Sequence, residues 1–69
     1  MEFKPIGNLG RNIKTYRKRK GLTQAECANA ASVGQSMWAS WENNTRVPSI
    51  KMLFFMAQLL DCSMEQLCE

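Results

Sequence analysis

Histidine is absent from this 69-residue sequence, and cysteine is scarce. The three cysteines are Cys27, Cys62 and Cys68, and no two of them are closely spaced. Structural zinc sites need closely spaced cysteine and histidine ligands, and a complete disulfide framework needs an even number of cysteines. We therefore expect no zinc, no disulfide framework and no cofactor, and we predict a cytoplasmic protein with reduced thiols.

Long apolar runs are also missing. The longest run, Met52–Ala57, is far shorter than the roughly 20 apolar residues that cross a bilayer. Residues 1–20 lack the apolar segment of a signal peptide. A glycine-rich phosphate loop, a metal-ligand cluster and an activated nucleophile are likewise not found, and Cys27 is predicted on the inward side of a helix. We therefore expect neither a membrane protein nor an enzyme, and no small-molecule ligand.

The composition is that of a folded domain, with 45% hydrophobic and 22% charged residues. A chain of this length has room for one domain, which we predict over residues 1–69. The net charge is +3, and most of the positive charge lies within residues 11–20. Such a cluster is either a solvated helix face or a surface that faces phosphates. The cluster consists of Arg11, Lys14, Arg17, Lys18, Arg19 and Lys20.

The first two helices are predicted from apolar spacing and capping residues. The first runs from about Asn8, its N-cap, to Lys20, and Gly21 ends it. Thr23 and Glu26 form a capping box that starts a second helix, which is expected to end near Ala31. The inward face of the first helix carries apolar residues at spacings of three and four: Ile6, Leu9, Ile13 and Tyr16.

A third helix follows a tight turn at residues 32–34. Trp38 and Trp41 share one of its faces, and small polar side chains occupy the others. In the next turn, Asn44 tolerates a left-handed conformation, and Pro48 prevents the preceding residue from being helical.

Two more helices complete the predicted fold. Ser49 caps a fourth helix that ends at Asp61, and Ser63 and Gln66 form a capping box for a fifth helix that runs through Leu67. The inward side of the fourth helix is predicted to carry Ile50, Leu53, Met56, Ala57 and Leu60. The expected fold class is all-α, a compact domain of five short helices.

This arrangement resembles the Cro/repressor-type (Xre-like) helix-turn-helix family of phage and bacterial regulators over about residues 9–67. The resemblance implies a lambda-repressor-like domain with its helix-turn-helix at about residues 23–43. It also implies a sequence-specific transcriptional regulator, in particular a repressor, that inserts its third helix into the major groove of double-stranded DNA. A repressor-like protein–protein interaction module or antitoxin is the alternative. The resemblance is carried by Leu9-Gly10, Ile13, Arg17, residues 20–24, Glu26, Ala28, Val33, Gln35-Ser36, residues 41–43, Arg46 and Pro48-Ser49.

Several positions depart from the family pattern. Cys27 and Ala31 replace leucines, and Trp38 replaces a β-branched residue, so that tryptophan is expected to fill the vacated volume. We interpret Trp38 as core rather than as a base-stacking group. Ser32 replaces the glycine of the turn and Gly34 replaces a hydroxyl N-cap, each at a cost of about 0.5–1 kcal/mol.

The resemblance implies base contacts from the start of the third helix. Glutamine can bond two atoms of adenine, a serine hydroxyl can serve guanine or adenine, and an apolar side chain can contact the thymine methyl group. A solvated role is the alternative for each candidate. The candidates are Gln35, Ser36, Met37 and Ser40.

Phosphate contacts are implied at both ends of the helix-turn-helix. Gln24 is expected to hold a phosphate where the second helix begins and to brace Gln35. Asn43, Thr45 and Arg46 resemble a second phosphate clamp, although Arg46 is alternatively a residue that holds the loop together.

One arginine of the basic cluster is assigned differently. In the family, the arginine at the position of Arg17 pairs with the glutamate at the position of Glu42, so we interpret these two as a structural ion pair. The alternative for Arg17 is a solvent-facing phosphate contact. Residues 18–20 remain candidates for outer phosphate contacts.

The fourth helix carries more apolar residues than one core can bury. Met52, Phe55 and Leu59 form a second stripe, and an exposed apolar patch commonly marks a partner site. We predict a homodimer through these three residues, joined by Met64 and Leu67. The alternative is that Phe55 and Leu59 are covered by the N-terminal segment near Phe3 and Ile6.

Overall fold

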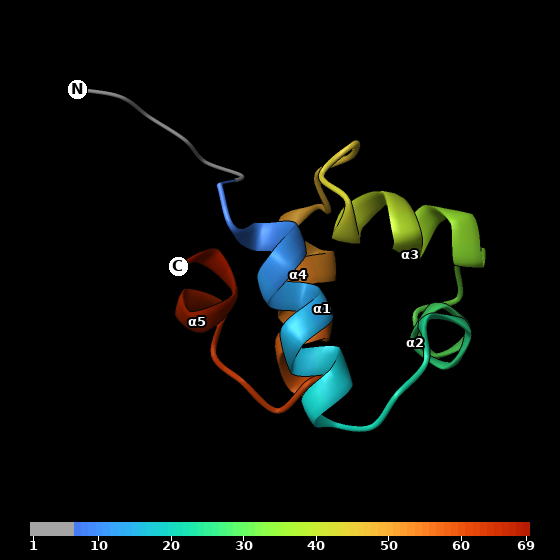
Figure 1. Ribbon diagram of the computed structural model, residues 1–69, viewed down its shortest axis with the longest axis horizontal. Helices are drawn as coiled ribbons and strands as arrows, with labels where there is room; N and C mark the ends of the chain where they lie inside the picture. The colour runs from blue at the N-terminus through green and yellow to red at the C-terminus, as the bar shows by residue number, and fades with distance from the viewer. Residues whose placement is uncertain (1–6) are drawn as a thin grey trace.

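The computed structural model describes residues 7–69, and this part of the chain contains five α-helices and no strand. Figure 1 shows α1 at the centre, with α2 and α3 on one side of it and α5 on the other. Helix α1 contacts both α3 and α5, and α4 contacts α5. The all-α prediction is thus confirmed. The predicted inward position of Ile6 lies outside the described residues. The helices are α1 (Leu9–Arg19), α2 (Gln24–Ala30), α3 (Gln35–Glu42), α4 (Ile50–Leu59) and α5 (Met64–Cys68).

Side-chain caps fix the starts of most helices. The Thr23 hydroxyl accepts from the backbone N–H of Glu26 at 3.0 Å, while the Glu26 carboxylate accepts from the backbone N–H of Thr23 at 2.8 Å. The predicted capping box of α5 and the Ser49 cap of α4 are also present. Asn8 precedes α1 as predicted, but its side chain makes no capping bond there. Its amide is directed instead to the backbone carbonyl of Glu69, at 3.4 Å.

Left-handed residues follow four of the helices, near positions where the sequence predicted a helix end or a turn, and one of them is Asp61 with φ of 57°. Gly21 has φ of 74° and Asn44 has φ of 65°. Ser32 has φ of 59°, so the turn between α2 and α3 places a side chain where a glycine would be unstrained. The unusual backbone conformation expected at Ser32 is therefore present, and its energetic cost stays a prediction.

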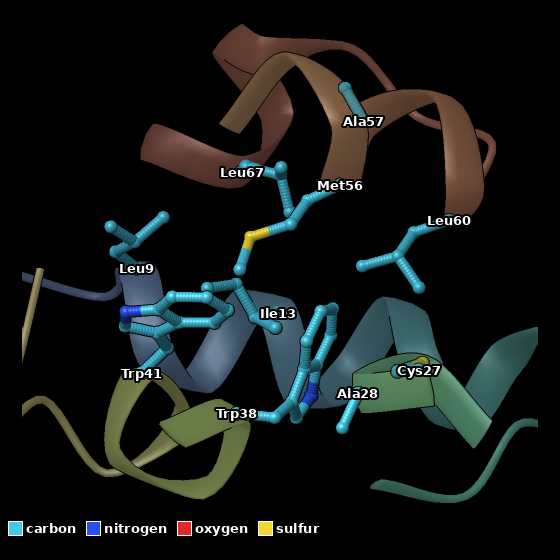
Figure 2. Packing of buried hydrophobic residues seen from close by; sticks show 10 residues of the cluster. All are labelled: Leu9, Ile13, Cys27, Ala28, Trp38, Trp41, Met56, Ala57, Leu60 and Leu67. Carbon is cyan, nitrogen blue, oxygen red and sulfur yellow. The ribbon is translucent and has the colours of Figure 1, made fainter. Parts of the chain in front are cut away.

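The core gathers side chains from all five helices around Trp38, which is fully buried (Figure 2). Trp38 and Trp41 pack edge to face, with ring centroids 5.7 Å apart. Cys27 and Ala28 of α2 lie beside Trp38, as expected if the tryptophan fills the volume that smaller residues vacate. The interpretation of Trp38 as a core residue is confirmed. The core consists of Leu9, Ile13, Cys27, Ala28, Trp38, Trp41, Met56, Ala57, Leu60 and Leu67.

One inward assignment on α4 is wrong. Ile50 is 70% exposed, whereas Met56, Ala57 and Leu60 are buried as predicted and Leu53 is half-buried. Burial on this helix is concentrated in its second half, towards α5, so the first turn is left uncovered on the side of Ile50.

None of the helices in residues 7–69 has the length and apolar character needed to span a membrane. The three cysteines carry free thiols, and burial raises the pKa of Cys27 and of Cys62.

Candidate nucleic-acid interface

A tight turn fixes α2 against α3. The backbone N–H of Val33 donates to the carbonyl of Ala28 at 3.0 Å, and the Val33 side chain packs against the core. Gly34 then occupies the N-cap of α3 with an extended backbone and without a capping side chain. Two short helices are thus joined by a few residues in one fixed orientation, which is the geometry of a helix-turn-helix.

A buried ion pair ties α1 to α3. The Arg17 Nε donates to Glu42 Oε2 at 2.5 Å, and a second guanidinium nitrogen donates to Oε1 at 3.3 Å. A third nitrogen of Arg17 donates to the backbone carbonyl of Leu22 at 2.8 Å, in the segment that leads into α2. The predicted pair is therefore present. Because the Arg17 side chain is buried in this pair, it is not a solvent-facing phosphate contact.

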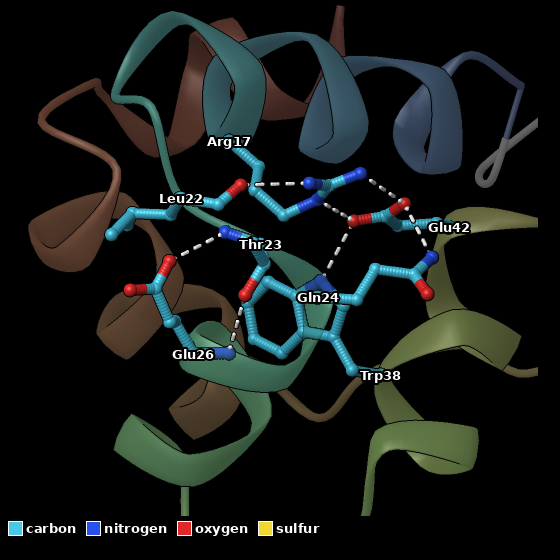
Figure 3. Close-up of polar contacts among 7 residues, drawn as sticks. All are labelled: Arg17, Leu22, Thr23, Gln24, Glu26, Trp38 and Glu42. Carbon is cyan, nitrogen blue, oxygen red and sulfur yellow. Dashed lines mark hydrogen bonds and ion pairs between the residues drawn. The ribbon is translucent and has the colours of Figure 1, made fainter.

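Two further side chains complete the surroundings of the Glu42 carboxylate (Figure 3). The Trp38 indole N–H donates to Oε2 at 2.8 Å, and the Gln24 amide donates to Oε1 at 3.0 Å. Burial by itself would raise the pKa of Glu42. The hydrogen bonds from Arg17, Gln24 and Trp38, together with the positive charge of Arg17, outweigh burial and lower that pKa. The carboxylate is therefore held ionised at a junction of α1, α2 and α3.

Sequence reasoning missed these last two contacts. Gln24 was expected to brace Gln35, but its amide nitrogen donates to Glu42 instead. Trp38 was expected as plain core, and its position four residues before Glu42 on one helix was the available signal for the hydrogen bond. The phosphate contact of Gln24 stays a prediction.

The base-contact candidates occupy different environments. Gln35 and Ser36 are exposed on the first turn of α3. Met37 is half-buried and packs against the core, and the Ser40 hydroxyl donates to the Met37 carbonyl at 2.6 Å. The structure thus leaves the first two side chains open to a ligand, whereas Met37 and Ser40 are engaged within the domain. All four base contacts stay predictions.

The loop after α3 is held by its own hydrogen bonds. The Asn43 side-chain oxygen accepts from the Thr45 backbone N–H at 3.0 Å and from the Thr45 hydroxyl at 2.7 Å. The backbone N–H groups of Thr45 and Arg46 both donate to the Ser40 carbonyl. Arg46 contributes to the loop through its backbone, while its side chain is exposed and forms no hydrogen bond or ion pair within residues 7–69.

The start of α1 contacts the end of α3 at Gly10. The Gly10 N–H donates to the Asn44 side-chain oxygen at 3.1 Å. A Cβ atom at Gly10 would lie 2.3 Å from the Glu42 carbonyl oxygen, so only glycine permits this approach. The sequence indicated the left-handed backbone of Asn44 but not this contact.

Apart from Arg17, the basic cluster remains at the surface. Arg19 lies over the Tyr16 ring, 5.1 Å from its centroid. The exposed members are Arg11, Lys14, Lys18, Arg19 and Lys20. They are available to a polyanion, and contacts of residues 18–20 with phosphates stay predictions.

The predicted dimer residues of α4 are all half-buried. Met52 and Leu59 pack against the core of their own domain, as does Met64 of α5, while Leu67 is fully buried. The place of Met52, Phe55, Leu59 and Met64 in an interface stays a prediction. The assignment of Leu67 to the interface is wrong, because this side chain has no exposed surface to offer a partner. The alternative cover by Phe3 and Ile6 lies outside the described residues.

The fold and the α2–turn–α3 geometry define a helix-turn-helix protein of the Cro/repressor type. The chain belongs to the helix-turn-helix family, whose sequence profile matches residues 13–67. This is a family of non-enzymatic, DNA-binding regulators.

Similar curated proteins are transcriptional regulators by name. The HTH-type transcriptional regulator SinR of Bacillus subtilis is 39% identical over 62 residues, which cover 88% of this chain and 56% of SinR. YazB of the same organism, another HTH-type transcriptional regulator, is 34% identical over 58 residues, which cover 84% of each chain. The competence pilus inhibition repressor of Acinetobacter baylyi is 30% identical over 60 residues, or 87% of this chain and 54% of that repressor. This chain thus spans about half the length of SinR and of the pilus repressor. No solved structure matches it.

Proposed function

We propose that this protein is a sequence-specific transcriptional repressor that acts in the cytoplasm as a homodimer on double-stranded DNA. Helix α3 enters the major groove, which is wide enough to admit one α-helix. The observation that carries the proposal is the exposure of Gln35 and Ser36 at the amino end of α3, directly after the tight turn. In a helix-turn-helix, these first residues of the second helix are the ones that contact base edges.

A rigid support makes this arrangement suited to reading sequence. Base recognition needs side chains held to within a fraction of an ångström by the surrounding structure. The Glu42 carboxylate joins α3 to α1 through Arg17 and to α2 through Gln24. Helix α3 is thus fixed by hydrogen bonds to the charged Glu42 carboxylate as well as by the packing of its two tryptophans. We infer that Gln35 and Ser36 read bases, with Met37 and Ser40 at the margin of the contact.

Phosphates would be held on both sides of α3. The amino end of α2, where Gln24 begins the helix, offers free backbone N–H groups, and the loop after α3 offers Asn43, Thr45 and Arg46. The loop is pre-ordered by the hydrogen bonds between Asn43 and Thr45, so little entropy is lost when it meets the backbone of DNA. The exposed cations of α1 add a longer-range attraction for the polyanion.

Binding to bulk duplex DNA over a series of salt concentrations tests the proposal. If phosphates are neutralised by lysine and arginine, the logarithm of the association constant falls linearly with the logarithm of salt concentration, by about 0.9 per phosphate contact. Fluorescence anisotropy of a labelled random duplex gives this slope. An absence of DNA binding at low salt would contradict the proposal and favour a protein–protein interaction module or antitoxin. If the chain binds duplex DNA, selection of sites from random DNA will define the operator.

A further inference from the structure

The exposed large apolar side chains of the described residues lie on one side of α4 and on the loop before it. Phe54 is 58% exposed and Ile50 is 70% exposed, one helical turn apart, and Val47 is 58% exposed. Lys51 and Gln58, also exposed, share the same side of the helix. We call Ile50, Lys51, Phe54 and Gln58 the α4 outer face. Leaving such large apolar groups in water is unfavourable unless another surface covers them.

A groove adjoins this face. It has a volume of about 560 Å³ and is walled by the second half of α4 and by the start of α5. Phe54 lies at its edge, and its other lining residues include Ala57, Gln58, Asp61, Cys62 and Met64. The surface thus carries a projecting aromatic ring beside a hollow.

We propose that the α4 outer faces of two copies of this chain pair antiparallel, with a two-fold axis midway between Phe54 and Gln58, so that each Phe54 enters the groove of the other copy. The proposal rests on the homodimer proposed above and assigns its contact surface. In a two-fold interface every contact occurs twice: where residue i of one copy meets residue j of the other, residue j of the first copy meets residue i of the second. This axis brings Phe54 opposite Gln58 and Ile50 opposite Cys62, and both Gln58 and Cys62 line the groove.

Charge complementarity favours a second copy as the occupant. Lys51 is the one charged residue within α4, and Asp61 follows the carboxyl end of the helix; both side chains are exposed. The same two-fold axis that seats Phe54 brings Lys51 of one copy opposite Asp61 of the other. Antiparallel pairing therefore places opposite charges at both ends of the contact, whereas parallel pairing would place like charges together.

The alternative dimer surface on α4, formed by Met52, Phe55 and Leu59, has less exposed apolar area to bury. Met52 and Leu59 already pack against the core of their own domain, and Phe55 is half-buried. Burial of a surface stabilises a dimer in proportion to the apolar area removed from water. Ile50 and Phe54 have more of that area left to bury than Met52 and Leu59.

Sedimentation of Phe54→Lys and Phe55→Lys beside the unmodified chain separates the two surfaces. We expect the unmodified chain and Phe55→Lys to be dimers at tens of micromolar protein. The dimer dissociation constant of Phe54→Lys should be at least about tenfold higher, as expected for a residue at the centre of an interface. Circular dichroism checks that each variant is folded. A dimer unaffected by Phe54→Lys would overturn the proposal. An unmodified chain that is monomeric at these concentrations would also overturn the proposal. If that monomer still binds a single half-site in a salt-dependent manner, the proposed DNA-binding function stands without this interface.

A cysteine pair tests the register independently of affinity. In a Cys68→Ser background, Ile50→Cys places a thiol opposite Cys62 of the other copy. Helix α4, Ile50–Leu59, alone rises about 14 Å along its axis. Residue 50 is therefore too far from Cys62 of its own chain and, in this register, from residue 50 of the other copy to form a disulfide. With oxidised glutathione as oxidant, we expect a covalent dimer that Cys62→Ser abolishes. A failure to cross-link, or cross-linking that survives Cys62→Ser, would contradict the proposed register.

Discussion

The indole N–H of Trp38 donates to the carboxylate of Glu42 at 2.8 Å, from four residues earlier on the same helix. This carboxylate also accepts from Arg17 of α1 and Gln24 of α2, so Trp38 contributes to a polar junction as well as to the core. A buried carboxylate is stabilised only when its oxygens are fully satisfied. The role of this tryptophan can therefore be separated into volume and hydrogen bonding.

Replacing Trp38 with phenylalanine keeps an aromatic ring and removes the donor. Loss of a hydrogen bond to a charged group costs about 1.5–3 kcal/mol. Trp41→Phe is the matched control, because the Trp41 N–H has no hydrogen-bond partner within residues 7–69. Urea unfolding should show that Trp38→Phe loses more stability than Trp41→Phe by about that amount. Equal losses would mean that the Trp38 hydrogen bond adds nothing to stability.

Acid should weaken the fold through Glu42. Its pKa in the folded protein is lowered from the ordinary value of 4.5. The stability that it contributes is therefore fully present above pH 4.5 and is lost as the pH falls towards the folded-state pKa. The unfolding free energy of the unmodified chain should thus decline more steeply in this acid range than that of Glu42→Gln, in which the titrating group is gone.

Glu42→Gln removes one partner of a buried ion pair, which costs about 3–5 kcal/mol of stability. The variant and the unmodified chain should therefore both be measured in sodium sulfate, which stabilises folded states. Parallel pH profiles for the two proteins would show that another carboxylate is responsible for the acid sensitivity.

Gly10 should tolerate no side chain. In Gly10→Ala, the added Cβ would lie 2.3 Å from the Glu42 carbonyl oxygen and 2.7 Å from the Asn44 side-chain oxygen, and it would push α1 away from α3. Overpacking of this kind costs about 1–3 kcal/mol. Gly34→Ala is the control, because a Cβ there meets nothing within 4 Å. Thermal melting should separate the two variants, and equal melting temperatures would refute the close contact.

Ser32 offers a stabilising substitution. Its φ of 59° is strained for serine and relaxed for glycine. Ser32→Gly should therefore gain about 0.5 kcal/mol, after subtraction of the extra entropy of the unfolded glycine. Lys14→Gly, in the exposed middle of α1, should instead lose about 1 kcal/mol. If Ser32→Gly destabilises the protein as Lys14→Gly does, the turn is not strained in solution.

Local chemistry explains why most of the fold could be predicted from the sequence. The capping boxes at Thr23 and Ser63 and the turn residues Gly21 and Asn44 involve neighbours in the chain, so their patterns are readable without tertiary information. The pairing of Arg17 with Glu42 is a contact between distant residues, and it was predicted only because the sequence resembles a known family.

Placement of apolar side chains on α4 shows where prediction failed. This helix carries apolar residues on nearly every side, so spacing alone does not decide which of them face the core. The packing of α5 against the second half of α4 decides which side chains face the core. Ile50 is left exposed, and so is Phe54, for which the sequence analysis made no assignment. The partner of the Gln24 amide was predicted wrongly for a similar reason: the packing of α2 against α3 decides it, and the amide donates to Glu42 rather than to Gln35.

The central claim, that α3 reads DNA sequence, is tested most directly by the affinities of Gln35→Ala and Arg46→Ala for a selected site and for random duplex DNA. Loss of a base contact should lower affinity for the selected site by about 1–3 kcal/mol and relax preference at one base pair, with little change on random DNA. Arg46→Ala, a phosphate-contact variant, should weaken both equally and reduce the salt slope by about 1. A Gln35→Ala variant that loses the same affinity on both DNAs, or none on either, would contradict the account.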